Sequence, residues 1–402
     1  MEFCANIREF LPRYDEIKKI LRNGPEADSI LRMAIADVED KNATPGFNEE
    51  VYYLVNSLAD NYWERIHTGH FSAVPLEVRK IYALANYFKI FYLLSESVSQ
   101  PQLMRCSEVL DEAILIGCTH GLYVNSDDFQ AQLTSHISKS LEDYPSSDLP
   151  IIEELKREQC KCDIPVLDCP SVEDFRTKCF MTQQPALLLN TIAHWPAMQK
   201  WRNLNYLHKL AGNRTVPIEI GAIYTADEWS QQLVKIQDFL RRQFTQNSSK
   251  EIEYLAQHEL FDQIPALKAD IRVPDYCTLR SNKNCTNVEN VSIKAWLGPK
   301  NTISPLHYDP EHNLLCQVFG KKQIILAAPT DTPKLYAHDS EMLCNTSQLD
   351  ATRLDFDRFP LAAEVSFYNV TLQAGDCLYI PPKWWHYVRA ESESFSVSFW
   401  WS

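Results

Sequence analysis

The sequence predicts an α+β fold in which an N-terminal helical domain precedes a jelly-roll β-barrel with flanking helices. Three observations indicate this. Apolar residues recur at helical spacing through the first 145 residues, a stretch rich in acidic residues and proline follows, and short alternating runs dominate from about residue 290 onward. We expect a helical domain over 1–145, a linker over 146–164 and a second domain over 165–402, with its β core at about 290–402.

The overall composition excludes several classes of protein. The chain has 402 residues, of which 45% are hydrophobic, so it can form two domains with substantial cores. Its net charge is −14, and the absence of a run of five basic residues disfavours direct binding to nucleic acid. No apolar run has the roughly 18 residues that a membrane helix needs, and the first residues lack a signal-peptide pattern. We therefore expect an intracellular protein without a membrane partner.

The helical domain is predicted from two apolar repeats. The first comprises Val51, Leu54, Leu58, Tyr62 and Ile66, and the second comprises Val78, Ile81, Ala85, Phe88 and Tyr92. Breaks are expected at Thr68-Gly69 and at residues 99–101. The isolated histidines of this domain, which are interpreted as structural or surface residues, are His67, His70 and His120.

Twelve cysteines are scattered along the chain, which favours free thiols over a disulfide framework. Cys160 and Cys162 form the one tight pair. A zinc knuckle would need two further ligands at suitable spacing, and only Cys169 and Cys179 follow. Free thiols are the favoured interpretation, and any metal or redox role of the pair is left open.

Strand-like pieces dominate the second domain. We expect strands at 186–189 and 216–220, then a helix over 227–240 on the spacing of Trp229, Leu233, Ile236 and Leu240. Further strands are expected at 291–296, 314–319, 322–328, 377–381 and 395–400. Gly320-Lys321 is interpreted as the tight turn of a hairpin between the pieces at 314–319 and 322–328. So many short strands after a mixed lead-in favour a jelly roll of the cupin type.

A candidate metal site lies in this domain. His307 and Asp309 are two positions apart in a strand-like run, so their side chains point to the same face. His386, near the C-terminus, is the best third ligand. Two histidines and one carboxylate on one face of an iron ion leave positions open for a cosubstrate and oxygen. The competing interpretation is a surface histidine and aspartate beside a turn that begins at Asp309-Pro310.

Lys322 strengthens the metal hypothesis. Strand alternation places it on one face with Ile324 and Leu326, and a lone lysine on an apolar face suggests a bound anion such as a keto-acid cosubstrate. Lys321 fits a surface position better. Uncharged groups that can assist in the same neighbourhood are Asn313, Ser304, Tyr254 and Trp296.

Five runs of sequence carry a resemblance to a known family: 302–310, 317–322, 336–339, 345–348 and 383–390. In these runs the chain strongly resembles the JmjC family of iron(II) and 2-oxoglutarate oxygenases. The resemblance covers roughly residues 165–402. It implies a double-stranded β-helix, Fe(II) as the metal, and 2-oxoglutarate and O2 as cosubstrates. It also implies a role in chromatin regulation and a nuclear location, with the cytoplasm as the alternative.

The resemblance further implies individual roles. His307, Asp309 and His386 would hold iron. Lys322 would pair with the distal carboxylate of 2-oxoglutarate, assisted by Tyr254, Ser304 and Asn313, with Trp296 lining the pocket. Many relatives carry threonine where this chain has Ser304, and either hydroxyl can donate. Glu219 and Trp229 match positions beside a substrate arginine; a carboxylate can bind a guanidinium and an aromatic ring can stack on it.

The leading functional hypothesis is hydroxylation of an arginine side-chain carbon in a protein substrate. The alternative within the class is removal of methyl groups from histone methyl-lysine, because the same metal triad serves both reactions. Two other classes are a catalytically silent JmjC scaffold and a cupin isomerase or zinc-dependent sugar enzyme. The intact triad argues against the scaffold, and Lys322 would have no purpose in the sugar enzyme. The substrate and the oligomeric state are not predicted.

Overall fold

The computed structural model describes residues 7–40, 47–68, 73–96, 99–140, 148–158, 162–221, 223–225, 228–245, 251–280, 291–340 and 343–402. The chain forms two compact units. The first comprises Met1–Ser146 together with Lys209–Thr215, and the second comprises Ser147–His208 together with Val216–Ser402. The chain therefore returns to the first unit for a short segment before it completes the second.

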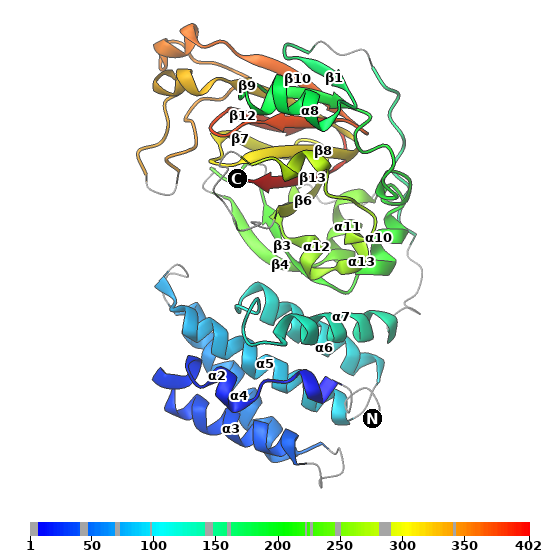
Figure 1. Ribbon diagram of the computed structural model, residues 1–402, viewed down its shortest axis with the longest axis vertical. Coiled ribbons are helices and arrows are strands. Elements are labelled where there is room, and N and C mark those ends of the chain that lie inside the picture. Colours follow the sequence, from blue (N-terminus) through cyan, green and yellow to red (C-terminus); the bar gives the residue numbers. More distant parts are fainter. Residues whose placement is uncertain are drawn as a thin grey trace. The chain divides into compact units, whose positions relative to one another are not determined.

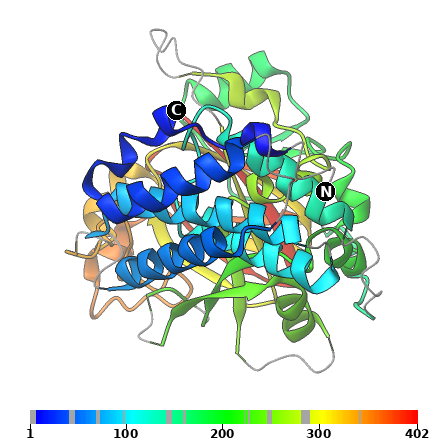
Figure 2. The same cartoon turned by 90° about the horizontal axis from the view of Figure 1, so that it is seen from below.

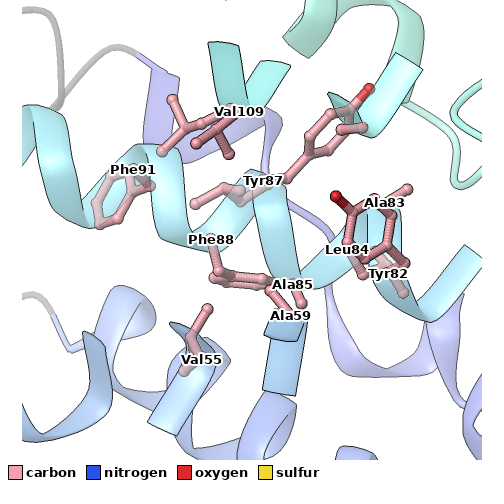
Figure 3. Packing of buried hydrophobic residues seen from close by; sticks show 14 of the residues in the cluster. Val55, Ala59, Tyr82, Ala83, Leu84, Ala85, Tyr87, Phe88, Phe91 and Val109 are labelled. Carbon is pink, nitrogen blue, oxygen red and sulfur yellow. The ribbon is translucent and has the colours of Figure 1, made fainter. Parts of the chain in front are cut away.

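The first unit is a bundle of helices that lie side by side (Figure 2). At its centre is α5, which is buried over most of its circumference because apolar residues occur on every side of it from Ile81 to Leu94. Figure 3 shows Phe88 and Tyr87 of α5 between Val55 of α4 and Val109 of α6. The helices of this unit are α2 (Tyr14–Ile17), α3 (Pro25–Glu39), α4 (Glu49–His67), α5 (Leu76–Glu96), α6 (Gln100–Leu115) and α7 (Ser126–Ser140).

Both predicted repeats form helices, and local signals set their ends. Asn48 caps α4, since its side-chain oxygen accepts a hydrogen bond from the Val51 backbone N–H at 3.3 Å. Ser99 precedes α6, which accounts for the break predicted at 99–101. The His67 ring lies against Trp63 and His120 is exposed, whereas His70 lies outside the described residues. Each helix that the structure describes is too short or too polar to cross a lipid bilayer.

Two sheets form the second unit (Figure 1). The nine-stranded sheet has the order β1-β2-β11-β8-β13-β6-β5-β3-β4, and the four-stranded sheet has the order β10-β9-β12-β7. The strands are β1 (Val166–Asp168), β2 (Ala186–Leu189), β3 (Thr215–Ile220), β4 (Ser230–Lys235), β5 (Glu253–His258), β6 (Ser292–Gly298), β7 (Ile303–Tyr308), β8 (His312–Phe319), β9 (Lys321–Ala327), β10 (Tyr368–Gln373), β11 (Cys377–Ile380), β12 (Trp385–Ala390) and β13 (Ser394–Trp401). The predicted jelly roll is therefore confirmed.

Short helices flank the sheets. They are α8 (Val172–Phe175), α9 (Ala197–Lys200), α10 (Leu204–Ala211, whose end belongs to the first unit), α11 (Ile236–Phe244), α12 (Leu260–Gln263) and α13 (Pro265–Lys268). A π-helical turn over Arg176–Phe180 follows α8.

An apolar core fills the space between the two sheets. Ile324 of β9 and Leu372 of β10 contribute from the four-stranded sheet, and Leu315 of β8 and Leu378 of β11 from the nine-stranded sheet. The opposite face of the four-stranded sheet is also apolar. It is covered by the chain that connects β9 to β10, through side chains such as Phe359. This sheet is therefore packed on both faces, which holds its strands rigidly around the site described below.

The structure corrects the hairpin predicted at Gly320-Lys321. β8 and β9 are consecutive strands, but they belong to different sheets and do not pair. Gly320 has φ +80°, and a Cβ atom there would lie 2.0 Å from the Glu393 carbonyl oxygen. The glycine is required because the chain crosses between sheets at this corner and passes directly against another backbone segment.

The helix predicted over 227–240 is wrong in its first half. Residues Ser230–Lys235 form β4, and only Ile236–Phe244 form a helix. The four-residue spacing of Trp229 and Leu233 suggested a helix, but pairing with β3 at the edge of the sheet outweighs this local signal.

The sheets draw on more of the chain than the predicted β core at about 290–402. Five strands that precede residue 290, β1 to β5, belong to the nine-stranded sheet. Part of the predicted linker also contacts the barrel. Arg157 binds the buried Asp376 at 2.7 Å, and the Glu158 backbone N–H donates to Gln373 at 2.9 Å.

Candidate metal and cosubstrate site

Two neighbouring strands bring His307 and His386 together. β7 and β12 pair antiparallel with these two histidines directly opposite each other, and their ring centroids are 4.2 Å apart. Asp309 comes immediately after β7, and its Oδ2 lies 3.6 Å from His386 Nε2. One ligand atom from each of the three residues falls within 4.8 Å of the others, and no other such group of three is present in the described residues.

The hydrogen bonds of the two imidazoles leave the same atom of each ring available. His307 Nδ1 is bonded to the Pro305 carbonyl oxygen at 2.7 Å, and His386 Nδ1 to the Trp384 carbonyl oxygen at 3.0 Å. Nε2 of each ring is thereby free to bind a metal as an unprotonated nitrogen. Burial and the neighbouring His307 hold the pKa of His386 well below its ordinary value, which favours this neutral form.

The Asp309 carboxylate also favours a bound metal. Asp309 Oδ2 is buried and has no hydrogen-bond partner, although a buried carboxylate oxygen is normally satisfied. A divalent cation between this oxygen and the two Nε2 atoms would remove the deficit. Two nitrogen donors and one carboxylate on one side are the donor set typical of non-haem iron oxygenases.

Lys322 lies in the same cavity. Its side chain is 1% exposed, and its ammonium contacts the Tyr254 hydroxyl at 3.3 Å. No carboxylate pairs with it among the residues that the structure describes. Burial lowers the pKa of Lys322 to about 7. A buried cation without a counter-ion is costly, so this position is prepared for an anionic group.

Uncharged side chains line the wall of the cavity between Lys322 and the triad. They come from β5, β6, β7 and β8, and they are Tyr254, Trp296, Ser304 and Asn313. The Trp296 indole donates to the Ser398 hydroxyl at 2.8 Å. The amide oxygen of Asn313 is buried and lacks a partner within the described structure. All eight residues named for metal and cosubstrate thus share one cavity.

A bulge in β7 allows Ser304 to share this cavity with His307. The two residues are three positions apart, so a regular strand would direct them to opposite faces. The ladder between β7 and β12 shifts here: His386 pairs with His307, but Val388 pairs with Ser304. The extra residue in β7 turns both side chains toward the cavity.

Glu219 also lines the cavity, from β3. It is half-buried, and no lysine, arginine or histidine among the described residues forms an ion pair with it. Burial raises the pKa of Glu219, and the neighbouring Trp229 opposes this rise. Trp229 does not line the cavity itself; it lies beside Glu219, where the chain enters β4.

Several lining residues were not predicted from the sequence, among them Tyr224, Gln257, Asn345 and Trp400. Tyr224 lies in the connection between β3 and β4 and contacts the Thr346 hydroxyl at 3.3 Å. Gln257 has φ +53° within β5, where the ladder to β6 is irregular. Tyr224 and Asn345 lie in loops and Gln257 lies at a bulge, where no periodic signal exists. Trp400 lies in β13, where alternation alone does not tell which face of the strand lines a cavity. Cys162 is half-buried beside the Ile164 carbonyl, and Cys160 lies outside the described residues.

Comparison with known proteins places the chain in a family. A family model described as a cupin-like domain matches residues 172–402. Over 400 residues the chain is 57% identical to Jumonji C domain-containing protein 5 of Drosophila melanogaster, with 98% of each chain covered. The chain belongs to the JmjC proteins of the cupin-like family.

Other JmjC relatives are similar over smaller parts. Lysine-specific demethylase 8 of Danio rerio is 36% identical over 359 residues, covering 86% of each chain. Lysine-specific demethylase JMJ30 of Arabidopsis thaliana is 48% identical over 233 residues, covering 58% of this chain and 53% of the relative. The resemblance recognised in the sequence is therefore confirmed, and the residues matched by the family model, 172–402, include the His-Asp-His group.

Proposed function

We propose that this chain is an Fe(II)- and 2-oxoglutarate-dependent oxygenase that hydroxylates an arginine side-chain carbon in a protein substrate. The observation that carries the proposal is a single cavity that contains a three-residue metal group, a buried cation and a carboxylate without a cationic partner. Such a reaction requires a partner for each feature: a metal for the three-residue group, an anionic cosubstrate for the buried cation, and a cationic substrate side chain for the carboxylate.

His307, Asp309 and His386 would hold the metal. The two carbonyl-bound imidazoles present Nε2, and Asp309 presents its unsatisfied Oδ2. When bound, iron and 2-oxoglutarate supply the oxidation of an unactivated C–H bond by molecular oxygen, with succinate and carbon dioxide as co-products. The three protein ligands leave the remaining metal positions open for this chemistry.

Lys322 would bind the distal carboxylate of 2-oxoglutarate. Its protonated ammonium supplies the charge, and the Tyr254 hydroxyl beside it can donate a second hydrogen bond. Ser304 and Asn313 would orient the cosubstrate, and Trp296 would close one side of the cavity. The apolar core next to this wall excludes water, which strengthens the charge pairing.

Glu219 would bind the substrate arginine. A half-buried carboxylate that lacks a cation can take a guanidinium through two parallel hydrogen bonds. The raised pKa of Glu219 would fall once that cation arrives, because an opposite charge favours the ionised form. Trp229, beside Glu219 but outside the cavity, would hold this carboxylate in place.

The second candidate is demethylation of methyl-lysine. It is favoured by the names of two relatives, which are described as lysine-specific demethylases. A methylated ammonium would also be attracted to Glu219, but it cannot form the two parallel hydrogen bonds of a guanidinium. In either case the partner is a protein, and we propose a nuclear location, with the cytoplasm as the alternative.

The test compares matched peptides. The full chain is incubated with Fe(II), 2-oxoglutarate and either an arginine peptide or the same peptide with methyl-lysine at that position. We expect the arginine peptide to gain the mass of one oxygen, with equimolar succinate, and His307→Ala to abolish both. Loss of methyl from the lysine peptide with no change in the arginine peptide would establish the second candidate instead. Equal succinate formation by His307→Ala and the wild type would contradict an oxygenase at this site.

A further inference from the structure

The outer edges of the two sheets are not protected equally. β1 ends the nine-stranded sheet with only three residues. At the edge of the four-stranded sheet, Asp163 is bonded to Asn369 of β10, its backbone N–H donating to the carbonyl at 3.1 Å. At the other edge, the Ser347 N–H donates to the Leu306 carbonyl of β7 at 2.8 Å. Short or covered edges such as these three prevent unwanted strand pairing.

The fourth edge, β4, is different. It has six residues, and the first four are exposed. In the described ranges, no segment forms a backbone hydrogen bond to its outer side. Its sequence contains no proline and no charge before the final Lys235, so it lacks the devices that usually block an edge. This uncharged edge, in a protein with three guarded edges, is thus available for pairing with a further strand.

The position of β4 connects it to the cavity. Trp229 directly precedes β4, and β3, which carries Glu219, is its neighbour in the sheet (Figure 1). The two strands meet closely at this end, since a Cβ on Gly221 would lie 3.6 Å from the Trp229 Cα atom. A bound peptide that extends away from Glu219 and Trp229 would therefore reach the open edge of β4 within a few residues.

We propose that residues flanking the substrate arginine add to the outer side of β4 as an extended strand, while the arginine enters the cavity. The inference rests on the proposed function and names the form of its substrate: an unstructured polypeptide segment rather than a folded surface. Main-chain hydrogen bonds would supply affinity in this mode, and side-chain pockets would supply selectivity.

The composition of β4 indicates which flanks fit. Its uncharged Ser230, Gln231 and Gln232 make no demand on the charge of the partner. Leu233, which is 43% exposed, offers one apolar contact. A flank with an apolar residue near the far end of β4 would therefore be preferred. Along an edge strand, every second residue directs its backbone N–H and C=O groups outward. The six residues of β4 therefore offer about three residues that can pair with a bound strand.

The first arm of the test varies the peptide and leaves the wild-type chain unchanged. A capped single arginine is compared with arginine peptides that carry an N-terminal flank, a C-terminal flank, or both. We expect one flank to raise kcat/KM by roughly two- to tenfold for each main-chain bond that it forms, chiefly through KM. Equal kcat/KM for the capped arginine and every flanked peptide would overturn strand addition while the hydroxylase function stands. Absence of oxygen gain in all substrates would overturn both.

The second arm tests the geometry of pairing. Backbone amides of the effective flank are N-methylated one at a time. In a strand pair, alternate N–H groups face the partner, so methylation should weaken turnover at every second residue and leave the residues between unaffected. A uniform effect along the flank would contradict strand addition.

The third arm uses hydrogen exchange of the full chain. We expect the peptide to slow exchange of alternate amides of β4. If these amides are already protected without peptide, in a manner that increases with protein concentration, the edge binds a second copy of the chain and the inference is wrong.

Discussion

The two candidate histidine ligands are oriented by very local contacts. In each case Nδ1 is bonded to the carbonyl oxygen of the residue two positions earlier, Pro305 for His307 and Trp384 for His386. Such a bond depends on the adjacent backbone rather than on a distant side chain. The ring orientation is therefore built into each strand, and pairing of β7 with β12 then brings the two Nε2 atoms to one side.

Because Lys322 is buried, we expect the affinity for 2-oxoglutarate to depend on pH. Because burial lowers the pKa of Lys322 to about 7, the empty site loses its ammonium as the pH rises through 7. 2-Oxoglutarate requires the charged form, so its dissociation constant should be constant well below pH 7 and rise up to about tenfold per pH unit above it. Calorimetric titration with Mn(II) in place of iron measures this constant from pH 6.5 to 9.

The control for this prediction is Lys322→Arg, since a guanidinium stays protonated throughout that range. The variant should bind 2-oxoglutarate more weakly at pH 6.5 but with little dependence on pH. The same slope in both proteins would assign the pH dependence to another group.

Substitution of Glu219 should weaken binding of the substrate and not of the cosubstrate. Glu219→Gln keeps the size of the side chain but removes the charge that would bind the guanidinium. We expect KM for an arginine peptide to rise about ten- to hundredfold, as for the loss of a charge-assisted hydrogen bond, with 2-oxoglutarate affinity unchanged. Glu228→Gln, at an exposed position nearby, is the matched control and should leave KM unaltered. Equal effects of the two variants would rule out a specific role for Glu219.

At the scale of elements, irregularities in the strands decide which side chains meet. The extra residue in β7 brings Ser304 to the same cavity as His307. Gln257, which also lines the cavity, lies where the ladder between β5 and β6 is irregular. Strand alternation by itself places Lys322 correctly, but it would have placed Ser304 on the opposite face from His307. The cavity is thus a product of regular strands at some positions and bulges at others.

Gly320 predicts a large effect on stability at the corner between β8 and β9. Gly320→Ala adds a Cβ that would lie 2.0 Å from a carbonyl oxygen, at φ +80°. We expect a loss of about 3 kcal/mol or more, from backbone strain together with the steric clash. Denaturant unfolding followed by tryptophan fluorescence measures the change.

Gly375 provides the matched control in the same unit. Its φ is +91°, but a Cβ there would meet only the end of the flexible Met198 side chain, at 3.8 Å. Gly375→Ala should therefore cost only the strain, about 1–2 kcal/mol. Equal losses for the two variants would show that the close approach at Gly320 is relieved by movement of the chain.

At the scale of the whole molecule, the proposed site lies entirely within one of the two units. Ligands that bind the folded form should therefore stabilise that unit selectively. Mn(II) at a hundred times its dissociation constant should add about 2.7 kcal/mol to the free energy of unfolding of that unit. Calorimetry should show a higher Tm for the transition of the barrel and no change for the helical unit.

The same measurement on His307→Ala provides the control. This variant should lose the stabilisation by metal, and a chelator should return the wild type to its unliganded Tm. A shift that persists in His307→Ala would contradict a metal site formed by the triad.

The sequence by itself determined the class of fold, the family and the chemically distinctive side chains. Helical repeats and strand alternation arise from local backbone geometry, and histidine, aspartate and lysine in an apolar context are conspicuous in any chain. The prediction failed where local signals compete with distant pairing. Residues 230–235 have helical spacing but form β4, and Gly320 suggested a hairpin where the chain instead changes sheets.

Only the tertiary structure decided which of these residues share a cavity and which strand edge remains open. The meeting of His307 and His386 depends on the pairing of strands far apart in the chain. Whether Glu219 forms an ion pair within the described residues depends on which strands and loops the fold places around it. These are properties of non-local contacts, and a single sequence specifies them only through the folded chain.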